Sequence, residues 1–95
     1  MKHFVVVAQN PTVIQQNTIM KNIIEGNYAY WHWISNVWLL KDSGLYPHDD
    51  TGTLRDKIKE AAPGLNFTVF EVLPTDWAGF SDMKWAEWLN QHWKV

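Results

Sequence analysis

The stretch Tyr28–Lys41 reads YAYWHWISNVWLLK and decides how this chain folds. Two runs rich in aromatic and β-branched residues, Tyr28–Ile34 and Val37–Lys41, flank the polar pair Ser35-Asn36. Such side chains favour a pleated strand, and a two-residue polar break is typical of a tight hairpin turn. The stretch therefore predicts a β-hairpin.

Successive residues of a strand face opposite sides of a sheet. Trp31 and Trp33 are therefore expected on one face of the hairpin. The other face takes the remaining large side chains of the first run, which are Tyr28, Tyr30, His32 and Ile34. Because both faces carry rings, we expect neither of them to lie against bare water.

The segment before the hairpin predicts a strand and a helix. The valine-rich run His3–Gln9 indicates a buried strand. Asn10 is expected to cap the next helix, with Pro11 at its first position. Gly26-Asn27 is expected to end this helix. Its buried face is predicted from apolar residues at helical spacing, which are Val13, Met20, Ile23 and Ile24.

The segment after the hairpin begins with an acidic loop, Asp42–Asp50. The run TGTLRDKIKEAA then predicts a second helix, capped by Thr51 or Thr53 and ended by Pro63-Gly64. Alternation over Asn66–Leu73 predicts a further strand.

A last helix is expected to open at Ser81-Asp82. Its apolar stripe follows the spacing i, i+3, i+4 and i+7 and consists of Trp85, Trp88, Leu89 and His92. The predicted order is thus β-α-β-β-α-β-α. This order predicts one α+β domain over residues 1–95, a ferredoxin-like β-α-β-β-α-β sandwich with an additional C-terminal helix. The fourth strand is expected beside the first, followed by the third and the second, in an antiparallel sheet with two helices on one face.

Composition limits the classes of function. The chain has 95 residues and no cysteine, which excludes a disulfide framework, a thiol nucleophile and a cysteine-based zinc site, and which is compatible with the cytoplasm. Its net charge of −2 and its single arginine, Arg55, argue against a basic footprint over the whole chain, although a local patch stays open. Apolar runs are shorter than the roughly 18–20 residues of a membrane span, so no membrane partner is expected.

A family resemblance is carried by four segments, which are the first strand with Asn10-Pro11, then YWHWISNVWLLK, then TGTLRDKIKEAA, and then FTVFEVL followed by DWAGF. With them the chain resembles small bacterial and phage proteins of the SinR-like family, most specifically in the hairpin and in Leu54-Arg55-Asp56. That family is similar in fold to small CRISPR-associated proteins that bridge integrase subunits during spacer capture, and to toxin-type ribonucleases. The resemblance implies a ferredoxin-like homodimer, of phage or mobile-element origin.

The resemblance also bears on catalysis. Nuclease-competent relatives place an aspartate at the end of the first strand, where it helps to hold a divalent metal. The matching residue here is Asn10, and a neutral amide is a weak ligand for a hard cation. We therefore expect no catalytic residue, no metal and no cofactor. If the chain were a nuclease, its site would be the region around Asn10.

The other side chains that could bind a metal, transfer a proton or contact a phosphate are expected to have structural roles instead. His48-Asp49-Asp50 is expected to be a solvated acidic loop before a helix rather than a metal site. His32 is expected to be a packing or interface residue, with Glu71 as the alternative partner for proton transfer. His3 and His92 carry no signal. Arg55 and Lys57 are the candidates for a phosphate contact, although structural ion pairs are favoured.

The rings of the hairpin allow three interpretations: core and dimer interface, a stacking surface for bases, or a monomer core covered by the last helix. The residues in question are Tyr30, Trp31, Trp33 and Trp38. The leading hypothesis is a small non-enzymatic accessory protein that forms a homodimer through an aromatic-rich sheet face and can bind a protein partner. The alternatives are a metal-dependent nuclease and a binder of nucleotides or single-stranded nucleic acid.

Overall fold

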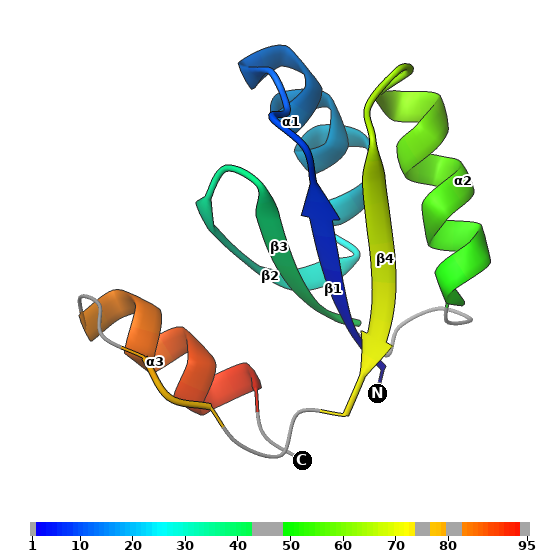
Figure 1. Cartoon of the computed structure of the whole chain (residues 1–95). Helices are drawn as coiled ribbons and strands as arrows, with labels where there is room; N and C mark the ends of the chain where they lie inside the picture. Colours follow the sequence, from blue (N-terminus) through cyan, green and yellow to red (C-terminus); the bar gives the residue numbers. More distant parts are fainter. Residues whose placement is uncertain (1, 43–48, 74–76, 80–82, 94–95) are drawn as a thin grey trace.

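The computed structural model describes residues 2–42, 49–73, 77–79 and 83–93. In this part of the chain two helical segments lie behind a twisted sheet, and the last helix lies beside its other face (Figure 1). The elements in chain order are β1 (His3–Ala8), α1 (Val13–Ile19), the π-helix η1 (Met20–Ile24), β2 (Tyr28–Ile34), β3 (Val37–Asp42), α2 (Thr51–Ala61), β4 (Phe67–Val72) and α3 (Met83–His92).

The sheet is antiparallel in the order β2-β3-β1-β4. Val6 lies at its centre, paired with Trp38 of β3 on one side and Val69 of β4 on the other. The predicted fold class is confirmed: the chain is an α+β protein whose four strands and three helices fit a ferredoxin-like sandwich with a C-terminal helix.

The main core lies between the sheet and the helices α1, η1 and α2. Strands β1 and β3 contribute Phe4, Val6 and Ala8 together with Trp38 and Leu40. The helices contribute Ile19, Ile23, Ile24, Leu54 and Ile58. All of these side chains are buried, so the middle of this sheet face is closed to water, whereas Tyr30 near its edge is 40% exposed.

The first helix begins later than predicted. Thr12 is its N-cap: the Gln15 amide donates to Thr12 Oγ1 at 3.0 Å, and the Thr12 amide donates to Gln15 Oε1 at 2.9 Å. The prediction of an Asn10 cap with Pro11 at the first helical position is wrong. Asn10 instead makes a left-handed turn with φ of 46°, a conformation that asparagine adopts more readily than most residues.

The buried face of this helix also differs from the prediction. Val13 is 71% exposed, because the helical phase changes where α1 passes into the π-helix η1. Ile23 and Ile24 face the core as predicted and Met20 packs against it, while Ile19 joins the core in place of Val13. The end of the helix was predicted correctly, since Gly26 follows it with φ of 83°.

The acid Asp50 caps α2, rather than Thr51 or Thr53. Its Oδ1 accepts a hydrogen bond from the Thr53 amide at 2.7 Å. A carboxylate satisfies this amide as a threonine hydroxyl would, and its charge is also favoured at a helix N-terminus.

The hairpin contains an irregularity that the alternation rule missed. Pairing shifts between Trp31 and Ile34, so that Ile34 pairs with Val37, which in turn pairs with Val7. A bulge of this kind places an extra residue in one strand and changes which face the following side chain takes. Ile34 therefore lies on the face of Trp31 and not with Tyr28. Strand β3 also continues through Asp42, where a loop was predicted to begin.

Candidate functional site

The face of the sheet turned away from α1 and α2 is here named the second face. Cross-strand register assigns its residues, because side chains of directly paired residues lie on the same side of a sheet. They are His3, Val5 and Val7 of β1, Ala29, Trp31 and Ile34 of β2, Val37, Leu39 and Lys41 of β3, and Thr68, Phe70 and Val72 of β4. Trp33 lies in the irregular part of β2, and its ring contacts with Trp31 and Trp85 place it on this face as well.

Helix α3 covers part of the second face. The ring of Trp85 lies edge-on to Trp31 with centroids 5.2 Å apart, and stacks on Trp33 at 5.8 Å and 28°. The interpretation in which the last helix folds over the sheet is therefore correct for this part of the face.

The end of α3 is held by the side chain of His3, a residue in which the sequence showed no signal. His3 Nε2 lies 3.0 Å from the His92 carbonyl oxygen, and the His3 ring meets Trp93 edge-on at 5.2 Å. His3 and Trp93 are both buried. The apolar stripe of the last helix was the available signal for Trp85 as a sheet-covering residue, but it did not include Trp93. Nothing in the sequence paired His3 with His92.

The rest of the second face stays open to solvent. Ile34, Val37, Val7 and Thr68 form one row across all four strands, and Phe70 lies in the next row. In these rows Val7 is 42% exposed, Ile34 46% and Phe70 52%, while Trp33 beside them is 44% exposed. We define Val7, Trp33, Ile34 and Phe70 as the open-face patch; all four side chains are uncharged and apolar.

The predicted set of interface rings does not form one surface. Trp31 and Trp33 lie on the second face, whereas Tyr30 pairs with Leu40 and so lies on the side of α1 and α2. Trp38 is 0% exposed and belongs to the core of a single chain. Its ring stacks on His32 with centroids 4.0 Å apart and planes at 5°.

His32 packs inside the fold. Its Nδ1 lies 2.8 Å from the Val37 carbonyl oxygen and its Nε2 lies 2.9 Å from Gln16 Oε1. Burial lowers the pKa of His32, and the hydrogen bond with the Val37 carbonyl raises it in part. Glu71 is not its partner, because Glu71 lies on β4 at the opposite edge of the sheet, 3.9 Å from Lys2.

The acids before α2 bind other parts of the same chain. Asp49 accepts a hydrogen bond from the Tyr28 hydroxyl at 2.8 Å and from Lys57 Nζ at 2.9 and 3.1 Å. Asp50 is the helix cap, and His48 lies outside the described residues. Within the described ranges, no group of three or more His, Cys, Asp or Glu side chains is arranged to hold a metal ion.

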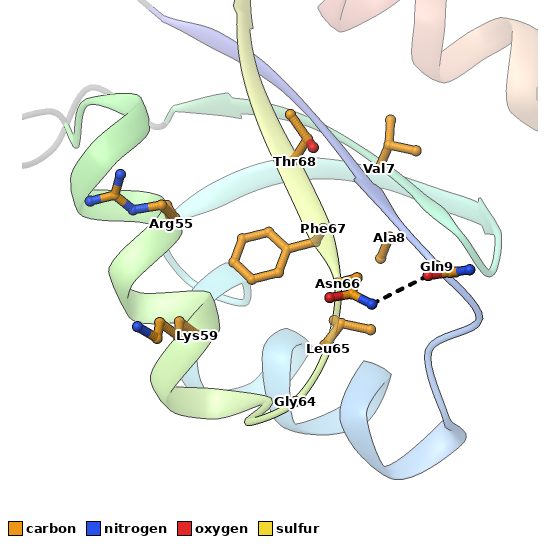
Figure 2. Close-up of a pocket in the computed structure, with 10 residues that line it drawn as sticks. All are labelled: Val7, Ala8, Gln9, Arg55, Lys59, Gly64, Leu65, Asn66, Phe67 and Thr68. Carbon is orange, nitrogen blue, oxygen red and sulfur yellow. Dashed lines mark hydrogen bonds between the residues drawn. The ribbon is translucent and has the colours of Figure 1, made fainter.

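The structure does not bring Arg55 and Lys57 together. Lys57 lines a hollow of about 450 Å³ that also includes Asn22 and Asn27. Arg55 lies instead with Lys59, one helical turn along α2, beside a second hollow of about 680 Å³ at the start of β4 (Figure 2). A single phosphate contacted by both predicted residues is therefore not supported by their placement.

Asn10, the candidate for a nuclease site, lies two residues after the end of β1 in an exposed turn. Its surroundings include amides: Asn66 Nδ2 donates to Gln9 Oε1 at 3.3 Å. Amide groups supply no negative charge for a divalent cation.

No protein-family model matches this chain, and no curated protein or solved structure matches it either. None of the helices described here is both long enough and apolar enough to cross a bilayer. The geometry of the fold and of its surfaces therefore carries the argument about function.

Proposed function

We propose that this protein is a small non-enzymatic interaction protein that forms a homodimer through the open-face patch. The observation that supports this proposal is the exposure of four apolar side chains on one sheet face, from 42% for Val7 to 52% for Phe70. Contiguous exposed apolar surface of this kind marks contact sites in soluble proteins.

A second copy of the chain is a suitable occupant. The patch contains no charged residue, so two copies can meet there without burying unpaired charge. Closed dimers use the same surface on both subunits, and sheets pack face to face readily. Trp33 and Phe70 supply the aromatic side chains in which interface centres are enriched. The resemblance to SinR-like proteins agrees with a homodimer and with an accessory role in a phage or mobile element.

Sedimentation velocity at tens of micromolar tests the proposal. The wild-type protein is expected to sediment as a dimer, and Phe70→Glu and Val7→Glu are each expected to shift it to monomer. Val13→Glu is the matched control, because Val13 is equally apolar and 71% exposed but lies on α1. A monomeric wild type, or a Val13→Glu variant that dissociates as readily as Phe70→Glu, would contradict the homodimer.

The exposed ring of Trp33 favours a second candidate function. Trp33 is stacked on Trp85 with its side chain 44% exposed, and a base can stack on such a ring. If the protein binds single-stranded nucleic acid, oligothymidylate will quench tryptophan fluorescence in the wild type and less so in Trp33→Leu. Equal quenching in both proteins would exclude Trp33 as a stacking site.

A further inference from the structure

Strand β4 is one edge of the sheet, paired on its inner side with β1. The Gln9 amide donates to the Asn66 carbonyl at 2.8 Å, which fixes the direction in which the backbone groups of this strand point. In an antiparallel ladder, residues alternate between bonding inward and bonding outward. Phe67, Val69 and Glu71 therefore direct their amide and carbonyl groups away from β1, toward the outer edge.

A basic groove lies between α2 and the start of this edge strand. The hollow of about 680 Å³ at the start of β4 shares Arg55, Phe67 and Thr68 with an adjoining hollow of about 230 Å³. Figure 2 shows the Phe67 ring projecting from β4 toward α2, which carries Arg55 and Lys59 on the same side. Among the described residues that line the two hollows, the charged side chains are Arg55 and Lys59, and both are cations.

We propose that the edge of β4 binds an extended acidic segment of a partner protein by strand addition. In this mode a peptide supplies a further strand, main-chain hydrogen bonds provide affinity, and alternate side chains provide specificity. The outward backbone groups of Phe67, Val69 and Glu71 offer the hydrogen bonds. Arg55 Nε lies 3.0 Å from Asp56 Oδ1. This ion pair is exposed and therefore weak, so Arg55 can exchange Asp56 for a carboxylate of the partner.

The register of β4 defines the sequence pattern of the partner. Residues placed opposite Phe67 and Val69 face α2, so carboxylates at these two positions meet Arg55 and Lys59. A carboxylate opposite Glu71 is disfavoured, because Glu71 is an acid on the same face. The intervening residues of the partner face the side of Phe70, which is 52% exposed, so they are apolar. The groove thus selects an alternating acidic and apolar segment.

Peptide binding tests this inference directly. The probe is the fluorescein-labelled peptide Val-Glu-Val-Glu-Val, whose two carboxylates lie opposite Phe67 and Val69, and the reference peptide has the same composition with Glu and Val in separate blocks. Fluorescence anisotropy is expected to show binding of the alternating peptide only. Lys59→Glu should weaken that binding about tenfold or more, whereas the matched reversal Lys21→Glu, on the exposed surface of η1, should leave it unchanged.

Backbone pairing is tested by methylating the peptide. N-methylation of one alternate set of its amides should abolish binding, while methylation of the other set is tolerated. No binding of the alternating peptide, equal binding of both methylated forms, or displacement of the peptide by oligothymidylate would overturn the inference.

The homodimer is tested separately: Trp33→Ala should leave peptide binding intact, and Lys59→Glu should leave the dimer intact. A dimer lost in Lys59→Glu would mean that a second copy occupies the β4 edge.

Discussion

Trp85 of α3 meets Trp31 of β2 edge-on, with ring centroids 5.2 Å apart and planes at 77°. Edge-on aromatic pairs contribute about 0.5–1.5 kcal/mol beyond the burial of their area. Trp33 stacks on Trp85 as well, with centroids 5.8 Å apart. These three rings come from two elements that are far apart in the sequence, and they fix the last helix to the sheet.

Trp85→Ala is therefore expected to loosen α3. We expect the free energy of unfolding in urea to fall by about 1–3 kcal/mol, less than for a fully buried tryptophan because Trp85 keeps some exposure. The emission of the remaining tryptophans should move to longer wavelength as Trp31 becomes hydrated. Met83→Ala, on the same helix at a side chain that is 77% exposed, is the control and should change neither quantity.

Trp31 and Trp33 are expected to act on different equilibria. Trp31 is 6% exposed and Trp33 is 44% exposed. Trp31→Ala should lower the free energy of unfolding by about 3–5 kcal/mol, because it leaves a cavity under α3. Trp33→Ala should lower stability less and weaken dimerisation instead. Urea unfolding at low protein concentration and sedimentation velocity separate the two effects; equal losses of stability would contradict this division.

The sequence predicted the elements and their order because the signals were local. Alternation over Asn66–Leu73 and the rings of Tyr28–Lys41 each set a strand without help from the rest of the chain. The errors about which side chains are buried arose where one residue changes the phase. The shift between Trp31 and Ile34 reversed the face of Ile34, and the π-helix after Ile19 turned Val13 outward. Neither irregularity has a sequence signature as strong as a Gly or a Pro.

The candidate site was predictable only in part. Trp31 and Trp33 were correctly expected to share one face, because alternation requires it. Their contact with Trp85 joins segments separated by about half of the chain, and the spacing of residues along the sequence does not predict a contact over such a separation. The groove between Arg55, Lys59 and the edge of β4 likewise depends on which strand ends the sheet.

Tyr28 is expected to make the fold sensitive to high pH. Burial, together with the hydrogen bond to Asp49, raises the pKa of Tyr28 above its ordinary value of 10.0. The unfolded chain therefore loses this proton first, so the stability that the neutral phenol contributes is present below about pH 10 and is lost as the pH rises further. Tyr28→Phe should cost about 1 kcal/mol at neutral pH and should flatten the alkaline loss. Urea unfolding between neutral pH and pH 11 measures both; an unchanged alkaline slope would exclude Tyr28 as its source.

His32 is expected to titrate below the ordinary value for histidine. Burial lowers its pKa from 6.5 and outweighs the hydrogen bond to the Val37 carbonyl. The unfolded chain takes up the proton first as the pH falls, so the stability from neutral His32 is present above about pH 6.5 and declines toward the lower pKa of the folded state. Because burial also lowers the pKa of His92, the measurement has to be residue-specific, as in an NMR titration of the ring protons. A pKa above 6.5 would mean that the two oxygens facing the ring, Val37 O and Gln16 Oε1, outweigh burial.

The purified protein is expected not to cleave RNA or DNA in the presence of magnesium or manganese. Metal-assisted hydrolysis of a phosphodiester requires charged ligands that hold the cation beside the scissile phosphate. At the end of β1 the chain offers Asn10, with the amides of Gln9 and Asn66 beside it. The described acids of the predicted loop already have partners within the chain, since Asp49 binds Tyr28 and Lys57, and Asp50 caps α2.

Incubation with labelled single-stranded RNA and DNA, with and without EDTA, is the measurement, and Asn10→Asp is its informative variant. If position 10 is the missing ligand, this variant can gain a metal-dependent activity that the wild type lacks. Activity of the wild type that needs the metal and disappears in Asn10→Ala would contradict the expectation. Activity that survives Asn10→Ala but disappears in Asp49→Ala would instead locate a metal site before α2, where the carboxylate of Asp49 would have to leave Tyr28 and Lys57 to bind the cation.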